Sequence, residues 1–270
     1  MIELNKIYNM DCLHGLKQID NESIDLTITS PPYDDLRTYN NSLIWDEIVW
    51  KKVIEELHRI TKQGGVVVWV VADKTKNGSE TGTSFKQALY FKETGFNLHD
   101  TMIYEKVNPI PLTHNRYEQQ FEYMFIFSKG KPKTFNPIMI KCKTSGAYTN
   151  RRKTGRVKEA AARNRDEITI TKSEKQKGNI WSYITGSKKG ETGNHPAPFP
   201  EALVKDHITS WSKKGDIVLD PFAGSGTTAK MSLLMDRNFV CFEKEKEYCD
   251  IITKRLCCIK QQMSFIEAIK

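Results

Sequence analysis

The six-residue apolar run from Val66 to Val71 constrains the fold more than any other feature of the sequence. It follows Gly64-Gly65 and contains no polar residue. Such a run is typical of a β-strand buried on both faces, as in the parallel sheets of α/β proteins. The segment before it carries apolar residues at 45, 49, 53, 57 and 60, which is the spacing of an amphipathic helix. A helix over 45–60 therefore leads into a buried strand.

The same alternation of helix and strand recurs elsewhere in the chain. Apolar patterning predicts further strands at 24–29, 100–105, 122–127, 216–219 and 239–243, and helices at 201–211, 228–235 and 248–262. Strands that alternate with helices indicate an α/β fold with a doubly wound, mainly parallel sheet.

The positive charge is concentrated between these parts. Residues 129–190 contain 17 Lys or Arg against four acidic residues, while the whole chain has a net charge of only +8. We interpret this stretch, with a short helix near 157–165, as an insertion between two parts of one sheet. Clustered cations favour a polyanionic partner because binding releases phosphate counterions. A solvated face or a disordered loop would also explain the charge.

Several protein classes are disfavoured by composition. No apolar run reaches the roughly 18 residues that a membrane span needs. The six cysteines form no Cys-x-x-Cys pair and have no histidine at metal-ligand spacing, so we expect reduced thiols and no metal site. The N-terminal residues do not form a signal or transit peptide. We therefore expect a cytoplasmic protein that makes no membrane contact.

A glycine-containing loop follows the predicted strand 216–219. Its sequence is Asp220-Pro-Phe-Ala-Gly-Ser-Gly-Thr-Thr, and a helix follows. Ligands of α/β proteins bind at this position, although a packing turn could use the same glycines. The phosphate-binding Gly-x-x-x-x-Gly-Lys is absent, and Ala229 replaces the last glycine of the dinucleotide fingerprint. Glu243 ends the next strand, where a carboxylate can accept from ribose hydroxyls, so we favour a nucleoside cofactor over a surface glutamate.

A second loop, Ser30-Pro31-Pro32-Tyr33, closes the strand 24–29. Consecutive prolines cannot continue a sheet ladder and leave their carbonyl groups available as acceptors. An exocyclic amino group of a base is a poor nucleophile, and two acceptors on its N–H bonds would favour attack. Tyr33 offers a ring on which the base can stack. By itself, the tetrapeptide could also be a plain strand-ending turn.

Taken together, the two loops resemble those of the DNA amino-methyltransferases, and in particular their permuted beta class. In that class the catalytic motif (Asp/Asn/Ser)-Pro-Pro-(Tyr/Phe) comes first in the chain and a target-recognition insertion follows it. The cofactor motif Asp-Pro-Phe-x-Gly-Ser-Gly-Thr-Thr comes near the end, as it does here. The resemblance covers nearly the whole chain. It implies a seven-stranded, Rossmann-like methyltransferase core formed by residues 1–128 and 191–270, with residues 129–190 as the insertion that reads DNA.

The resemblance also implies roles for individual residues. The catalytic residues would be Ser30, Pro31, Pro32 and Tyr33. The residues that bind S-adenosylmethionine would be Asp11, Cys12, Pro196, Phe199, Asp220, Pro221, Phe222, Ala223, Gly224, Ser225, Gly226, Thr227 and Glu243. DNA contacts are expected from Arg151, Arg152, Lys153, Arg163 and Arg165. His195 precedes the closing segment and is given no proton-transfer role.

The activity implied by the resemblance is methylation of a base that has been flipped out of duplex DNA. No Pro-Cys dipeptide is present, which disfavours a carbon-5 cytosine enzyme with a thiolate nucleophile. Serine at the first position of the catalytic tetrapeptide, here Ser30, is commoner among cytosine-N4 enzymes, and the following Leu36-Arg37-Thr-Tyr39 also resembles members of that group. We therefore expect methylation at N4 of cytosine, with N6 of adenine as the alternative. An RNA methyltransferase, a non-catalytic DNA-binding subunit and a dinucleotide oxidoreductase are weaker alternatives. A cognate restriction endonuclease would complete a restriction-modification system.

Overall fold

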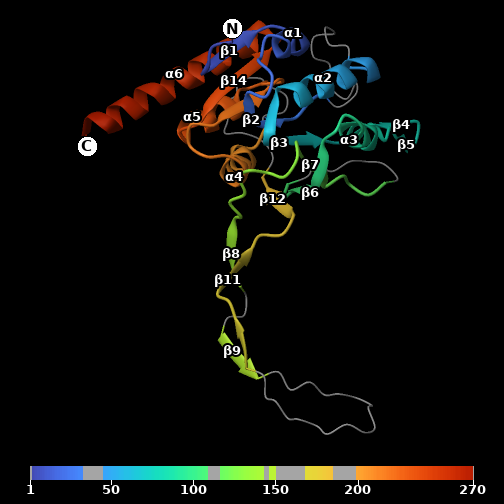
Figure 1. Ribbon diagram of the computed structural model, residues 1–270, viewed down its shortest axis with the longest axis vertical. Helices are drawn as coiled ribbons and strands as arrows, with labels where there is room; N and C mark the ends of the chain where they lie inside the picture. Colours follow the sequence, from blue (N-terminus) through green and yellow to red (C-terminus); the bar gives the residue numbers. More distant parts are fainter. Residues whose placement is uncertain are drawn as a thin grey trace. The chain divides into compact units, whose positions relative to one another are not determined.

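The computed structural model describes residues 2–32, 45–108, 116–142, 146–149, 168–184 and 199–269 (Figure 1). The chain divides into two compact units, one formed by 1–136 with 179–270 and the other by 137–178. The larger unit contains the main sheet and its helices. The smaller unit consists of short antiparallel strand pairs.

An eight-stranded sheet in the order β1-β14-β13-β2-β3-β7-β6-β12 forms the centre of the larger unit. Its strands are β1 (Lys6–Asn9), β2 (Ile24–Thr29), β3 (Thr61–Val71), β6 (Asn97–Lys106), β7 (Phe121–Ser128), β12 (Ile180–Tyr183), β13 (Ile217–Asp220) and β14 (Asn238–Glu243). β7 pairs antiparallel with both β3 and β6, and the other neighbouring strands pair in parallel. The carboxyl ends of β1, β14, β13 and β2 therefore lie side by side.

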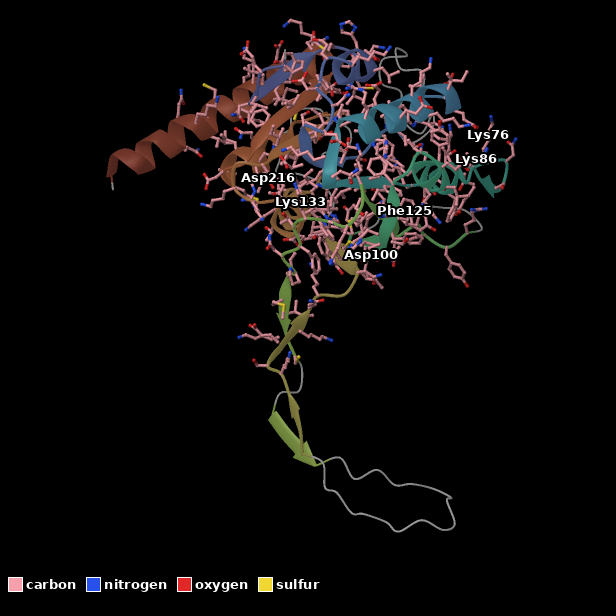
Figure 2. The ribbon with its side chains drawn as sticks, viewed as in Figure 1. Lys76, Lys86, Asp100, Phe125, Lys133 and Asp216 are labelled. Atoms are coloured by element: carbon pink, nitrogen blue, oxygen red, sulfur yellow. The ribbon has the colours of Figure 1, made fainter. Side chains whose placement is uncertain are left out.

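Three helices cover one face of this sheet. They are α1 (Cys12–Leu16), α2 (Glu47–Ile60) and α3 (Thr83–Glu93). Their buried side chains share one hydrophobic core with strand residues such as Trp69 and Phe127. Phe125 of β7, labelled in Figure 2, belongs to the same core and stacks on Tyr123. The minor strands β4 (Thr75–Lys76) and β5 (Ser79–Glu80) form a short hairpin before α3.

The opposite face is covered by α4 (Glu201–Trp211), α5 (Thr227–Leu234) and α6 (Lys246–Ile269). Ala229 of α5 and Ile252 of α6 pack against Phe239 and Cys241 of β14. The intervening residues of β14, Val240 and Phe242, belong to the first core. Residues of β14 thus alternate between two buried layers, as expected of a doubly wound sheet.

The smaller unit contains two consecutive strand pairs. β8 (Met139–Lys141) pairs antiparallel with β11 (Glu174–Gln176), and β9 (Gly146–Thr149) pairs antiparallel with β10 (Ile168–Thr171). A backbone hydrogen bond from Lys177 to Ile138 continues the first pairing. The predicted helix near 157–165 lies outside the described residues.

The predicted α/β class with a doubly wound, mainly parallel sheet is confirmed by this topology. The sheet has eight strands, one more than the expected seven. The smaller unit is also shorter than the predicted insertion 129–190, because β12 pairs with β6 in the main sheet and Asn136 donates to the carbonyl of Ser210. Within the described part of the chain, no helix has the length and apolar character needed to cross a membrane.

Candidate active site

The two motif loops lie next to each other at the carboxyl edge of the sheet. β2 ends at Thr29, directly before Ser30, and its neighbour β13 ends at Asp220, directly before the loop 221–226. β14 ends one strand further along at Glu243, and β1 leads to Asp11 beyond it. Segments from the two ends of the sequence thus meet where parallel sheets bind ligands.

The loop after β2 presents Ser30 half-buried, followed by the buried Pro31 and Pro32. Tyr33 lies outside the described residues. β2 itself is packed on both faces, since Leu26 and Ile28 are fully buried, as are the alternating Thr27 and Thr29. A rigid central strand therefore supports the loop that carries Ser30.

The loop after β13 requires glycine at two positions. Gly224 and Gly226 have φ angles of 51° and 78°, in the left-handed region that favours glycine. A Cβ atom on Gly226 would lie 2.5 Å from Cγ2 of Ile252, so α6 leaves no room for a side chain. The loop can therefore follow the end of the sheet closely and present backbone N–H groups.

Glu243 holds this loop in place. One of its carboxylate oxygens accepts from the Gly224 N–H at 2.7 Å, and the other accepts from the Glu245 N–H at 2.9 Å. Burial raises the pKa of Glu243 to about 7, an effect that the two N–H donors oppose. The remaining lone pairs of an ionised carboxylate can accept further hydrogen bonds.

Unsatisfied polar groups beside the loop fit a bound polar ligand. Gly226 is the N-cap of α5 and offers no side-chain cap, so the helix begins with uncapped N–H groups that favour a negatively charged group. The hydroxyl of Thr227 is buried and has no hydrogen-bond partner among the described residues. Phe222 packs edge-on against Trp45 at 5.1 Å, and the Trp45 Nε1 likewise has no partner in the described structure. These features fit the carboxylate and apolar parts of a ligand such as S-adenosylmethionine.

Comparison with known proteins identifies the family. The chain matches the DNA methylase family of N6 and N4 methyltransferases over residues 24–254. It is 51% identical over 241 residues to the orphan methyltransferase M.BamHII of Bacillus amyloliquefaciens, covering 87% of this chain and 89% of that protein. The chain belongs to the N6/N4 DNA methylase family. Its cofactor is accordingly S-adenosylmethionine.

Other relatives of this DNA methylase agree with that assignment. It is 30% identical to the type II methyltransferase M.BglII of Bacillus subtilis over 255 residues, which cover 92% of this chain and 68% of that protein. The fold is similar to the cytosine-N4-specific PvuII DNA methyltransferase, with a TM-score of 0.67, 18% identity and coverage of 93% and 85%. It is also similar to M1.HpyAVI solved with its cofactor, with a TM-score of 0.62, 24% identity and coverage of 93% and 98%.

Two further residues expected to bind the cofactor, Asp11 and Cys12, lie at the start of α1. Asp11 is the N-cap of α1, where one carboxylate oxygen accepts from the Leu13 N–H at 2.9 Å. Cys12 is buried at the start of the helix, and burial raises the pKa of its thiol to about 12. The thiol is therefore neutral near pH 7 and unsuited to nucleophilic attack.

Several residues expected at the methylase site lie beyond the part of the chain that the structure describes. Pro196 and the five DNA-contact candidates, Arg151, Arg152, Lys153, Arg163 and Arg165, lie outside the described residues, as Tyr33 does. Phe199 is half-buried directly before Pro200, the N-cap of α4. The described residues include no group of three side chains able to hold a metal ion.

The structure adds Thr29, Thr228 and Arg255, which the motif analysis did not assign to the site, and it shows what the predicted residue Asp220 contacts. Asp220 is almost fully buried and accepts from the hydroxyls of Thr29 and Thr228, each at 2.7 Å. Arg255 of α6 donates to the carbonyl of Ser225 within the glycine loop. Thr29 immediately precedes the first motif and Thr228 is the last residue of the second, but only the structure shows that both hydroxyls donate to Asp220.

Proposed function

We propose that this DNA methylase transfers a methyl group from S-adenosylmethionine to the N4 amino group of cytosine in duplex DNA. The observation that carries the proposal is the position of Ser30-Pro31 at the end of β2, directly beside the Asp220 loop at the end of β13. An amine held by the first loop would lie next to a methyl donor held by the second.

The proposed reaction begins with a cytosine flipped out of the duplex, at a cost of a few kcal/mol. The Ser30 hydroxyl and the Pro31 carbonyl accept hydrogen bonds from its amino group, and Tyr33 stacks on the ring. These contacts orient the nitrogen lone pair for in-line attack. S-adenosylmethionine would supply the methyl group from its sulfonium and leave as S-adenosylhomocysteine, while the methylated nitrogen gives up one proton to solvent. No covalent enzyme intermediate is needed.

The cofactor would be held by the residues around the glycine loop. Glu243 accepts from the ribose hydroxyls, and the uncapped start of α5 with the Thr227 hydroxyl binds the methionine carboxylate. Asp11 and Cys12 lie beside the adenine, Phe222 lines the site, and the segment with Pro196 and Phe199 closes over it. Pro221, Ala223, Gly224, Ser225 and Gly226 supply the loop backbone.

Cytosine is preferred because serine occupies the first position of the catalytic tetrapeptide. Adenine, methylated at N6, is the other base on which the family acts. The basic insertion supports duplex DNA as the substrate, with Arg151, Arg152, Lys153, Arg163 and Arg165 among the phosphate or base contacts. The relative M.BglII is named a type II methyltransferase and M.BamHII an orphan methyltransferase. We propose a modification enzyme of the bacterial cytoplasm. The name of M.BglII supports a restriction partner for it, whereas the name of M.BamHII does not.

The test is incubation with unmethylated duplex DNA and methyl-labelled S-adenosylmethionine, followed by nucleoside digestion and mass spectrometry. N4-methylcytosine is the expected product. N6-methyladenine would overturn the base assignment and leave the fold, cofactor and mechanism in place. Label in RNA but in no DNA of varied sequence would overturn the proposed substrate.

A further inference from the structure

The carboxylate of Asp220 connects both motif loops. Asp220 is 3% exposed and ends β13. Its Oδ1 accepts from the Thr29 hydroxyl at 2.7 Å and from the Phe222 N–H at 3.1 Å. Its Oδ2 accepts from the Thr228 hydroxyl at 2.7 Å. One side chain thus joins the last residue of β2, the glycine loop and the first turn of α5.

These hydrogen bonds are shielded from water. Thr29 is fully buried and Thr228 is 1% exposed. Burial raises the pKa of Asp220, and the two hydroxyls and the Phe222 N–H oppose this effect. In a low-dielectric interior such bonds are strong, and leaving one acceptor unpaired is costly. The network therefore resists separation of the two loops.

Resting on the proposed function, we infer that Thr29, Asp220 and Thr228 are positioning residues for methyl transfer. Thr29 immediately precedes Ser30, and Phe222 is the second residue of the loop 221–226, which is proposed to hold the cofactor. The Asp220 network consequently sets the distance between the target amine and the methyl donor. All three side chains are almost fully buried and form their hydrogen bonds within the protein, so we expect their effect to be transmitted through the loops.

Spacing of this kind has a large influence on rate. In-line transfer requires the reacting atoms to lie about 3–3.5 Å apart, and a displacement of about 1 Å costs roughly 100-fold in rate. The family resemblance implies that Asp220 binds the methionine part of the cofactor. With three donors already on its two oxygens, it is better suited to fixing the loop than to binding the ligand directly.

The neighbouring Thr27 provides a matched control. It lies two residues before Thr29 on the same strand and is equally buried, but its hydroxyl has no hydrogen-bond partner among the described residues. Thr27→Val and Thr29→Val make the same isosteric change in the same strand. Only the second removes a bond to Asp220.

The experiment compares Thr29→Val, Thr228→Val, the double variant, Thr29→Ser and Thr27→Val in the full chain. Hydrogen–deuterium exchange is measured on the peptide that contains Ser30 and on residues 221–226, without DNA or cofactor. Methylation kinetics give kcat and KM, and calorimetry gives the S-adenosylhomocysteine dissociation constant. Thermal unfolding checks that each variant is folded at the assay temperature.

We expect Thr29→Val and Thr228→Val each to increase exchange in both loops, whereas Thr27→Val matches the wild type. Turnover should fall about 10- to 100-fold in each valine variant, with the dissociation constant changed less than about threefold. Thr29→Ser should restore most of the turnover. The double variant should lose less than the product of the two single losses, because both act through Asp220.

The inference is overturned if Thr29→Val increases exchange only near β2, or if Thr29→Val and Thr27→Val have equal turnover. The exchange measurement does not depend on activity. If the wild type methylates no DNA while Thr29→Val still loosens both loops, the proposed function fails and the coupling of the loops stands.

Discussion

Ser30 carries the sharpest prediction at the scale of single residues. Removing its hydroxyl in Ser30→Ala takes away one acceptor for the target amine and should lower kcat about 100-fold, by analogy with the loss of one preorganised polar contact in other active sites. Cofactor affinity should be unchanged, because Ser30 lies outside the glycine loop. Steady-state kinetics and calorimetry test both statements. Ser23→Ala, at the other end of β2, is the control; an equal loss of turnover there would contradict the assignment.

Tyr33 is expected to act through its ring. Tyr33→Ala should lose stacking worth about 1–3 kcal/mol, which corresponds to roughly 5- to 150-fold in the rate at low DNA concentration. Tyr33→Phe keeps the ring and should retain most of the activity. Kinetics on the same duplex distinguish the two variants. Equal activity of Tyr33→Ala and wild type would remove Tyr33 from the catalytic set.

Glu243 should give cofactor binding a characteristic pH dependence. Its pKa is raised to about 7, and a protonated carboxyl can no longer accept fully from ribose hydroxyls. S-adenosylhomocysteine affinity should therefore rise as the pH is raised through about 7 and level off above it. Calorimetric titrations over the range from mildly acidic to mildly basic pH test this. The Glu243→Gln variant, whose side chain cannot titrate, should bind S-adenosylhomocysteine more weakly and with no pH dependence near 7. The same pH profile of affinity in both proteins would contradict this role of Glu243.

The same pKa shift predicts an effect on stability with the opposite sign. In the folded protein Glu243 binds its proton more tightly than in the unfolded chain, where its carboxyl has the ordinary glutamate pKa of 4.5. Its contribution to the free energy of unfolding therefore decreases as the pH rises from about 4.5 to about 7. Thermal unfolding without cofactor should show this decline in the wild type, relative to Glu243→Gln. A flat difference between the two proteins would contradict the raised pKa.

At the scale of elements, α6 contacts the glycine loop 221–226 and fixes its position. Arg255 donates to the Ser225 carbonyl and lies 3.0 Å from Glu201 of α4, which also pairs with Lys230 of α5 at 2.6 Å. The Arg255 side chain is 10% exposed, so the pair is more shielded than an ordinary surface ion pair. This cluster connects the three helices on one face of the sheet.

Arg255→Met should therefore weaken cofactor binding about tenfold while leaving the fold intact, because it removes the donor to the loop and keeps much of the side-chain volume. Lys246→Met on the same helix is the matched control, since Lys246 is 77% exposed and pairs only weakly with Asp250 at 3.4 Å. Calorimetry with S-adenosylhomocysteine measures both. Equal affinities in the two variants would show that Arg255 does not position the loop.

Elements with strong apolar patterns could be predicted from the sequence. The helix 201–211 matches α4 at both ends, and the predicted strands of the main sheet lie within one residue of β2, β13 and β14. α3 was missed because its buried face includes Ser84 and Gln87, which weakens the helical apolar period. β12 was missed because it is four residues long and lies within a basic stretch.

Only those site residues that belong to short sequence motifs could be predicted from the sequence. Ser30, Gly224, Gly226 and Glu243 stand in recognisable patterns that follow strands. The Thr29 bond to Asp220 spans 191 residues of sequence, and no local pattern indicates it. Such contacts follow from the order of strands in the sheet, which the motifs themselves do not specify.

At the scale of the whole molecule, the basic insertion should set DNA affinity. Replacing Arg151, Arg152, Arg163 and Arg165 with Gln should weaken duplex binding and make it less dependent on salt. The slope of log K against log salt should become shallower by about 0.9 for each phosphate that the variant no longer neutralises. Fluorescence anisotropy at several salt concentrations measures this. Four cations outside the insertion, Lys214, Lys246, Lys254 and Lys260, serve as the matched control set. An unchanged slope in the arginine variant would contradict a phosphate-binding role.

The pairing of β2 with β13 also matters while the protein is being synthesised. β2 leaves the ribosome early, whereas β13 begins only at Ile217. Until then β2 is an edge strand that carries Leu26 and Ile28, both fully buried in the finished sheet, and unpaired apolar edges promote aggregation. A nascent chain thus carries Ser30 long before residues 221–226 have been synthesised, so the proposed enzyme could not methylate DNA before synthesis passes β13, and its β2 edge stays unpaired for that interval.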